Sequence, residues 1–185
     1  MSEPFFRRAV LPALIALVVA AAMAPAQADA PVLATQLSKL SWLLGDWSCS
    51  IVAAIPGQSE QSLPSARVRY TVNPATRSLM EFLRTSQFTI SGSLAFAEGR
   101  YVEELTGAAV QTGPASQTVS QLLQGQDVDV TADRIDLSGT AHVTQGDIQL
   151  RSLRQRISND AYTESGFLLQ AGTWMQVESS SCKRV

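Results

Sequence analysis

The only histidine of this 185-residue chain is His142, and it limits the catalytic chemistry that the sequence can support. A Ser-His-Asp arrangement needs a histidine as general base, and a histidine zinc site needs several of them. His142 stands between the apolar Ala141 and Val143 in a segment where apolar and polar residues alternate. Alternate side chains of a strand point to opposite faces. We therefore expect His142 on the outer, solvated face, where it is neither a general base nor a haem ligand.

The carboxylates give no catalytic or metal-binding pattern. Asp127-Val128-Asp129 has too few oxygen ligands for a calcium loop. The sequence has no phosphate-binding glycine loop, nucleophile elbow or zinc-ligand spacing. We therefore expect no enzymatic activity and no cofactor or metal. Solvated faces and turn caps explain most of the carboxylates, namely Glu103, Glu104, Asp127, Asp129, Asp133, Asp136 and Asp147.

The two cysteines, Cys49 and Cys182, are the only ones in the chain, and they fall in the first and last predicted strands. A disulfide between them would join those strands, which is geometrically natural when a sheet has closed into a barrel. In an oxidising compartment, a disulfide is favoured over a metal site or free thiols. We predict that the two cysteines pair within the chain.

Residues 1–28 are typical of a cleaved export signal. Arg7 and Arg8 precede an apolar run over residues 10–23, and Ala26-Gln27-Ala28 supplies a small-residue cleavage site. The apolar run is shorter than the roughly 20 residues that a membrane-spanning helix needs, so cleavage is favoured over a transmembrane anchor. The general secretory route is preferred over the twin-arginine route, although both stay open. We expect a periplasmic or secreted protein.

Length and charge limit the remaining possibilities. The mature chain, residues 29–185, has a length that normally forms one domain with a substantial core. We expect no membrane span after signal cleavage. The net charge of the whole chain is −2, and removal of the leader makes it more negative, which argues against nucleic-acid binding. The oligomeric state is left open.

Apolar residues recur at every second position along most of the chain after residue 45. This period is typical of half-buried antiparallel strands, and it predicts about nine or ten of them. Residues 34–44 instead carry leucines at helical spacing and predict one short helix that ends near Gly45. The strand rhythm is found at Val68–Val72, Phe88–Phe96, Val128–Val130 and Ile135–Val143.

Two stretches break this rhythm, residues 55–66 and residues 106–118. Both are rich in Gly, Pro, Ser and Gln, which are frequent in loops. In an up-and-down barrel, such connections lie at the rims, where they shape an opening or are tolerated as surface insertions. We expect two long loops here.

The segment Leu40–Cys49, with Gly45-Asp46-Trp47 at its centre, resembles the opening of the lipocalin-like (calycin) proteins. Gly172-Thr173-Trp174 and the terminal Cys182-Lys183-Arg184 complete a pattern similar to small exported bacterial proteins of uncharacterised function with this fold. The resemblance implies an antiparallel up-and-down β-barrel in which Gly45, Trp47 and Trp174 are structural. The glycine-rich opening motif of the haem-binding, nitrobindin-type barrels is absent, so haem binding is not implied.

In lipocalins, an arginine from a late strand stacks on the Gly-x-Trp tryptophan, and Arg154 and Arg156 are the candidates for this role. Both have the parity of the apolar Ile148 and Leu150, so an unbroken strand directs them to the interior. A buried arginine needs an aromatic face, carbonyls or an anion. We predict a brace on Trp47, with an anionic ligand head group as the alternative.

The resemblance favours a binding protein for a small hydrophobic or amphipathic molecule, with Arg154, Arg156, Tyr70, Phe88 and Phe96 as the ligand-binding residues. The alternative is a structural or protein-interaction module of the cell envelope that has no small ligand. A hydrolase or isomerase would need acid and base groups that the interior-facing positions do not visibly supply. Barrels of this size either hold one small ligand or are filled by side chains, so the cavity decides between these hypotheses.

Overall fold

The computed structural model describes residues 33–54, 59–109, 118–143 and 146–185. The predicted export signal, residues 1–28, lies outside the described residues, as do residues 55–58 and 110–117 of the two predicted loops. Export and cleavage therefore stay predictions. No helix in the described ranges is long and apolar enough to span a membrane.

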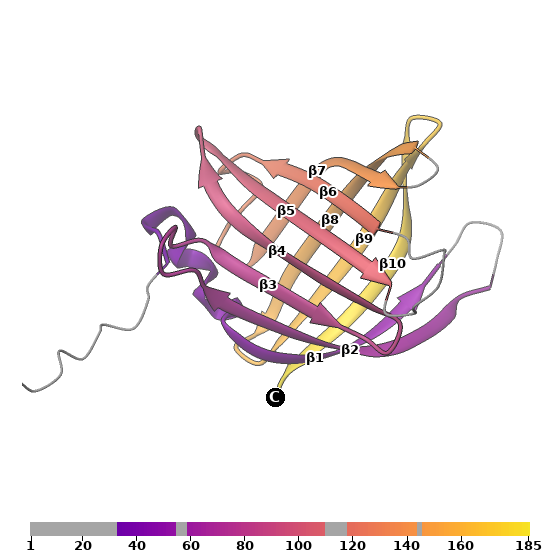
Figure 1. Cartoon of the computed structure of the whole chain (residues 1–185), viewed down its shortest axis with the longest axis horizontal. Coiled ribbons are helices and arrows are strands. Elements are labelled where there is room, and N and C mark those ends of the chain that lie inside the picture. The colour runs from indigo at the N-terminus through magenta and orange to yellow at the C-terminus, as the bar shows by residue number, and fades with distance from the viewer. Residues whose placement is uncertain (1–32, 55–58, 110–117, 144–145) are drawn as a thin grey trace, which may run out of the picture. The chain divides into compact units, whose positions relative to one another are not determined.

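The described chain forms a closed, ten-stranded antiparallel barrel preceded by one short 3-10 helix, as Figure 1 shows. The elements are η1 (Thr35–Leu43), β1 (Gly45–Ala53), β2 (Gln61–Val72), β3 (Leu79–Arg84), β4 (Phe88–Ala97), β5 (Arg100–Ala109), β6 (Thr118–Gly125), β7 (Arg134–Val143), β8 (Gly146–Ser158), β9 (Ala161–Gln170) and β10 (Thr173–Arg184). Each strand pairs with its neighbours in the chain, and β1 pairs with β10. The predicted all-β, up-and-down barrel with one N-terminal helix is confirmed.

The alternation of residue types explains the two faces of the barrel wall. In β2, Ala66, Val68 and Tyr70 are buried, whereas Arg67 and Arg69 are exposed. The buried set points inward and the arginines point outward, because successive side chains of a strand lie on opposite faces. His142 in β7 is exposed as predicted, and its Nδ1 lies 2.7 Å from Asp147 Oδ1.

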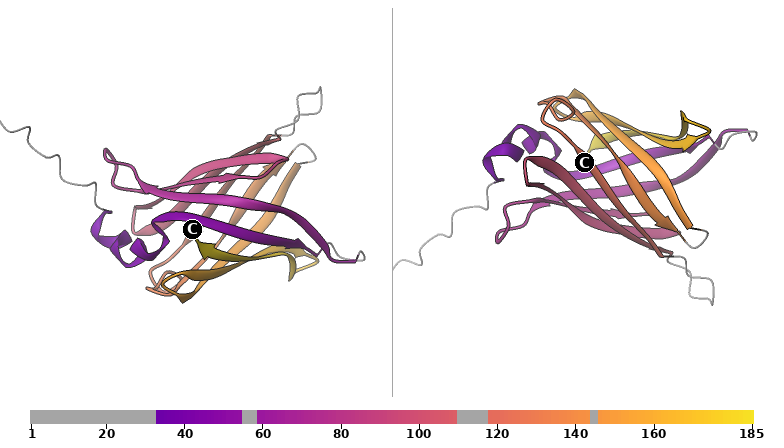
Figure 2. Two further views of the ribbon diagram at one scale, coloured as in Figure 1. Left: turned by 90° about the horizontal axis from the view of Figure 1, so that it is seen from below. Right: turned by 90° about the horizontal axis from the view of Figure 1, so that it is seen from above.

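The helix η1 covers one end of the barrel, which we call the helix end (Figure 2). Leu37, Leu40 and Leu43 are buried, and their three-residue spacing matches the three residues per turn of a 3-10 helix. Trp47 at the start of β1 is 0% exposed, and its Nε1 donates a hydrogen bond to the Leu43 carbonyl at 2.6 Å. The buried face of η1 therefore packs onto the apolar core inside the barrel.

Closure of the barrel is covalent as well as hydrogen-bonded. Cys49 of β1 lies directly opposite Cys182 of β10, and the two form a disulfide, as predicted. Gly45, at the start of β1, has a φ of +117°, and a Cβ there would lie 2.8 Å from Arg184 Nη1. A side chain at residue 45 would therefore meet both backbone strain and the end of β10.

Glycines also lie where the backbones of neighbouring strands come too close for a side chain. A Cβ on Gly92 in β4 would lie 2.0 Å from the Glu104 carbonyl oxygen, and one on Gly139 in β7 would lie 2.0 Å from the Leu122 carbonyl oxygen. No larger residue fits these distances. Glycines at such positions allow the strong curvature that closes a sheet into a barrel.

The structure corrects three boundaries predicted from the sequence. Residues 61–66 belong to β2 and residues 106–109 to β5, so the strands extend into both predicted loops. Pro64 is tolerated because it lies where the pairing of β1 with β2 shifts between Cys49 and Ile51, and a β-bulge does not need its missing N–H. Val128 is 81% exposed, and Val130 makes only an isolated bridge to Ile135, so no strand forms there.

Trp174 is out of phase with Cys182, although the two are eight residues apart and would share a face of an unbroken strand. The pairing of β10 with β9 shifts between Gln176 and Glu178. This shift adds one residue to β10 and reverses the alternation beyond it. Trp174 is half-buried opposite Leu169, outside the main core.

Candidate functional site

Arg154 lies at the centre of the barrel interior and is 2% exposed. Its Nε lies 3.1 Å from Glu164 Oε1 of β9 and its Nη2 lies 3.1 Å from Glu81 Oε2 of β3. Its Nη1 donates a hydrogen bond to Glu103 Oε1 of β5. One guanidinium from β8 is therefore shared among carboxylates of three other strands.

Strand register and alternation explain this convergence. Arg154 and Glu164 face each other directly across the β8–β9 ladder. Glu81 has the same parity as the buried Leu79, and Glu103 the same parity as the buried Tyr101, so both carboxylates point inward. The long arginine side chain reaches across the interior to carboxylates on other strands.

Two carboxylate oxygens of this cluster make no hydrogen bond to any described residue. Glu103 Oε2 and Glu81 Oε2 are buried and have no hydrogen-bond donor among the described residues, although Glu81 Oε2 contacts Arg154 as an ion pair. Burial raises the pKa of Glu81 to about 8, and the Arg154 charge only partly opposes this. Burial alone would lower the pKa of Arg154, but the charges of Glu103, Glu164 and Glu81 hold it well above its ordinary value.

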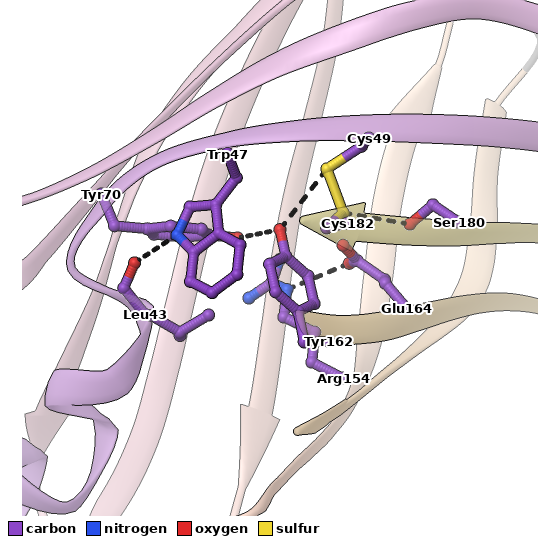
Figure 3. Close-up of a disulfide and its surroundings, with 9 residues drawn as sticks. All are labelled: Leu43, Trp47, Cys49, Tyr70, Arg154, Tyr162, Glu164, Ser180 and Cys182. Carbon is purple, nitrogen blue, oxygen red and sulfur yellow. Dashed lines mark hydrogen bonds and ion pairs between the residues drawn. A yellow bond between two sulfur atoms is a disulfide. The ribbon is translucent and has the colours of Figure 1, made fainter. Parts of the chain in front are cut away.

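Two tyrosines connect this cluster to the disulfide and to the helix end, as Figure 3 shows. The Tyr162 hydroxyl lies 3.5 Å from the Tyr70 hydroxyl and 3.8 Å from Cys49 Sγ. The Tyr162 ring packs edge-on against Trp47, with 4.8 Å between ring centroids. Burial raises the pKa of both tyrosines, so both stay neutral donors. They lie between the apolar side chains of the helix end and the cluster of Arg154, Glu81, Glu103 and Glu164, which we call the charged layer.

On the other side of the charged layer lies an interior cavity of about 130 Å³. Glu164 and Glu178 supply its carboxylates, while Leu123 and Leu150 supply apolar walls. The Ser152 hydroxyl, also in the lining, donates to Glu164 Oε1 at 2.9 Å. Burial and the nearby Glu164 charge raise the pKa of Glu178 to about 7. The cavity therefore has one acidic wall and one apolar wall.

Beyond this cavity, the barrel continues toward the end opposite η1, which we call the loop end. There the inward-facing side chains are only half-buried, in contrast to the fully buried ones at the helix end. Because they point inward and are still partly accessible, solvent reaches the interior at this end, which we call the mouth. They include Leu83, Phe88 and Ile90.

Only two of the predicted ligand-binding residues meet. Tyr70 lies next to Arg154, whose charge lowers the Tyr70 pKa against the larger effect of burial. Phe88 and Phe96 are eight residues apart in β4, hence roughly 26 Å at the usual rise of a strand. Phe96 packs edge-on against Tyr101 near the helix end, with 5.0 Å between centroids. Arg156 donates to Asn159 and lies over the Trp42 ring.

The predicted brace on Trp47 is wrong in its residue. Arg184 of β10, and neither Arg154 nor Arg156, lies over the Trp47 ring, with its guanidinium carbon 4.3 Å from the centroid. Arg184 also donates to the carbonyls of Leu44 at 2.6 Å and Trp42 at 2.7 Å. It occupies this place because it pairs directly with Trp47 across the β1–β10 ladder.

The expectation that the interior supplies no acid or base groups is also wrong. Glu103 is 1% exposed rather than solvated, and Glu81, Glu164 and Glu178 were not singled out from the sequence. Their period-two phase was the available signal, since Glu81 alternates in step with Leu79 and Leu83. Within the described ranges, no group of three or more acidic, histidine or cysteine side chains is arranged to hold a metal ion.

A larger hollow, of about 860 Å³, lies on the outer face of β1, β2 and β3. It is lined by the outward-facing Arg67, Arg69 and Arg84 and by Phe82, which is 46% exposed. Its charged groups are hydrated, whereas those of the interior cavity are buried with few donors. The interior is therefore the stronger candidate for binding a small molecule.

Comparisons with known proteins support the fold without naming an activity. No protein-family model and no curated protein matches the chain. Among solved structures, the chain is similar to Rv2717c from M. tuberculosis, at 18% identity and a TM-score of 0.57, over 83% of this chain and 99% of that one. It also matches a protein of unknown function from the DUF3598 family of Nostoc punctiforme, at 14% identity and a TM-score of 0.46, over 84% of this chain and 50% of that one. The first likeness shows the fold alone, and the ten-stranded barrel is consistent with the calycin-like architecture.

Proposed function

We propose that this chain is an exported, lipocalin-like protein that binds a small hydrophobic or amphipathic molecule through the loop end of its barrel, without catalysis. The observation that carries the proposal is the interior cavity between Leu123 and Leu150 on one side and Glu164 and Glu178 on the other. A barrel filled by side chains would leave no such space.

The two walls of the cavity suit a ligand with a polar end and an apolar body. Its volume of about 130 Å³ is several times the roughly 30 Å³ that a water molecule occupies in the liquid, so it can hold a head group. The half-buried Leu83, Phe88 and Ile90 extend the apolar lining toward the mouth, where the body of the ligand would lie.

A binding role is preferred over a hydrolase or isomerase because most of the acidic groups are already engaged. Glu81 and Glu103 are buried beneath the cavity and contact Arg154, so a substrate in the cavity would not reach them. Only Glu164 and Glu178 face the space, and Glu164 is itself bound by Ser152 and Arg154.

The test is a fluorescence titration of the protein, expressed with its own leader, with the neutral apolar probe N-phenyl-1-naphthylamine. We expect saturable binding to one site. Leu150→Trp, which fills the cavity, should weaken binding by about tenfold or more. Leu122→Trp is the matched control, because Leu122 is exposed on the outer face. A folded protein that binds no probe, or equal binding by Leu150→Trp, would contradict the proposal.

A second candidate, an envelope protein-interaction module, is favoured by the outer hollow. Arg67 and Arg84 lie directly opposite each other on neighbouring strands, a pairing of like charges that is unfavourable on its own. An acidic segment of a partner protein would relieve it. Salt-sensitive binding of a glutamate-rich peptide, lost in the variant Arg67→Gln with Arg84→Gln, would support this role, and no binding at low salt would exclude it.

A further inference from the structure

We infer that the polar end of the ligand is a protonated amine, held by Glu164 and Glu178, and not a carboxylate held by Arg154. This inference rests on the proposed function, because it assigns the head group that enters the interior cavity. It reverses the role that the sequence suggested for the buried arginine.

The first step is that Arg154 is not available to a ligand. Each of its three guanidinium nitrogens already contacts a carboxylate, from Glu81, Glu103 or Glu164. Arg154 is 2% exposed and does not line the cavity. An anionic head group would therefore have to displace a buried ion pair, leaving a carboxylate uncompensated, which is strongly unfavourable.

The second step is that the free groups at the cavity are acceptors. Glu164 Oε1 is bound by Ser152 and Arg154, and its Oε2 has no hydrogen-bond partner among the described residues. The Glu178 carboxylate likewise makes no hydrogen bond within the described ranges. Among the described residues, the one cation in the lining is Arg151, and its Nε and Nη2 both donate to Asp136 at 2.7 Å.

The third step is independent of the cavity lining and concerns the layer beneath it. Among the described residues, Arg154 is the one cation that contacts Glu81, Glu103 and Glu164, and the buried Glu103 Oε2 has no hydrogen-bond donor, so this part of the interior has fewer positive charges than carboxyl groups. Buried charges are normally paired, and like charges close together repel strongly where the dielectric constant is low. A cation entering the cavity would offset this excess of negative charge.

The fourth step selects the kind of cation. A primary ammonium carries three N–H donors on one compact charge, so one such group can donate to both Glu164 and Glu178. Charge-assisted hydrogen bonds of this kind are about twice as strong as neutral ones. The apolar wall at Leu123 and Leu150 then accommodates the first carbons of an alkyl chain. The ligand class is a primary alkylamine or an amphipathic molecule that ends in one.

The test compares three ligands with the same chain and different ends: dodecylamine, dodecanol and dodecanoate. Displacement of N-phenyl-1-naphthylamine from the protein, expressed with its own leader, measures each affinity near neutral pH and below the micelle concentration. We expect dodecylamine to bind about tenfold more tightly than the other two. Glu178→Gln should remove most of this preference while leaving dodecanol affinity unchanged, because it deletes a charge and keeps the shape.

The matched control is Glu104→Gln, an exposed residue of β5, which should change none of the three affinities. Glu178 is the primary target because, unlike Glu164, it makes no ion pair with Arg154 whose loss would lower the stability of the barrel. Tighter binding of dodecanoate than of dodecylamine would overturn the inference and leave the proposed function standing. An amine preference that survives Glu178→Gln and Glu164→Gln would also overturn it, whereas binding of none of the ligands, nor of the probe, would overturn the proposed function itself.

Discussion

Arg154 is the residue on which the interior depends most. Its guanidinium compensates carboxylates from three different strands, so its removal leaves charges buried without a partner. Replacing a whole buried ion network by apolar groups is often tolerated, but removing one member of it is not. The contribution of the cluster to stability is therefore measured by comparing variants that change one member with variants that change two.

We expect Arg154→Met to lower the free energy of unfolding by about 3–5 kcal/mol, because breaking a buried pair leaves an uncompensated charge. The double variant Arg154→Met with Glu103→Leu should be more stable than the single variant, since it removes one of the orphaned carboxylates. Urea denaturation near neutral pH measures both. A double variant less stable than Arg154→Met would show that unpaired carboxylates do not cause the loss of stability in the single variant.

Glu178 gives the stability of the ligand-free protein a defined pH dependence. Its folded-state pKa, raised to about 7 by burial and by Glu164, exceeds the roughly 4.3 of an unfolded chain. The folded state therefore binds the Glu178 proton more tightly than the unfolded chain does. This contribution to the free energy of unfolding is fully present below the unfolded pKa and is lost as the pH rises through 7. Glu178→Gln cannot ionise, so it should be more stable than the wild type by about 1–3 kcal/mol near pH 8.

Near pH 4 the difference should vanish, because Glu178 is then protonated in the folded protein and largely so in the unfolded chain. Thermal denaturation across this range, with Glu104→Gln as the control, follows the effect. Other groups near Glu178 that contribute charge are Glu164 and Arg154, and both remain in the variant. A stability difference that does not depend on pH would contradict the assigned burial of Glu178.

At the scale of the elements, the helix end is held by the last strand. Arg184 connects β10 to Trp47 of β1 and to the carbonyls of Trp42 and Leu44 at the C-terminal end of η1. These carbonyls lack partners within a short helix, so a cationic side chain satisfies them. The brace therefore joins two elements that are far apart in the sequence.

Arg184→Met should destabilise the protein by about 2–4 kcal/mol, because hydrogen bonds to a charged group and a cation–π contact are lost together. Lys183→Met is the matched control, since Lys183 is the exposed neighbour on the same strand, and it should cost little. Arg156→Met should also cost less, because Arg156 donates to the exposed Asn159 side chain and lies farther from its aromatic ring, 5.9 Å from the Trp42 centroid. Chemical denaturation measures the free energy of unfolding of the three variants. An equal loss for all of them would show that the Arg184 contacts do not stabilise the helix end more than those of the other two residues.

The elements were largely predictable from the sequence, whereas their contacts were not. The period of two in Val68–Val72 and Phe88–Phe96 follows directly from burial of one face, so the barrel strands could be predicted. The same parity places Glu81 and Glu103 inside, and attention to it would have identified them. Their meeting with Arg154 depends on the pairing of strands far apart in the chain, which no local pattern gives. The phase of Trp174 likewise depends on a bulge that no residue type near Gln176 indicates.

At the scale of the whole molecule, the disulfide joins a barrel that is already closed by hydrogen bonds between β1 and β10. Closure by strand pairing removes the exposed edges that a sheet would otherwise present. The covalent bond therefore does not define the topology; instead it limits how far the unfolded chain can expand. Its contribution should appear in stability more than in the folded structure.

The variant Cys49→Ser with Cys182→Ser should fold into the same barrel and lose about 4–5 kcal/mol of stability, because the bond closes a very long loop in the unfolded chain. The two cysteines are separated by 133 residues, which places the loop near the upper end of that scale. Guanidinium denaturation of the variant measures the loss, and the reduced wild type should match it. Wild-type protein whose midpoint does not respond to reductant would show that the thiols are free. A variant without strand structure would instead show that pairing of β1 with β10 cannot close the barrel alone.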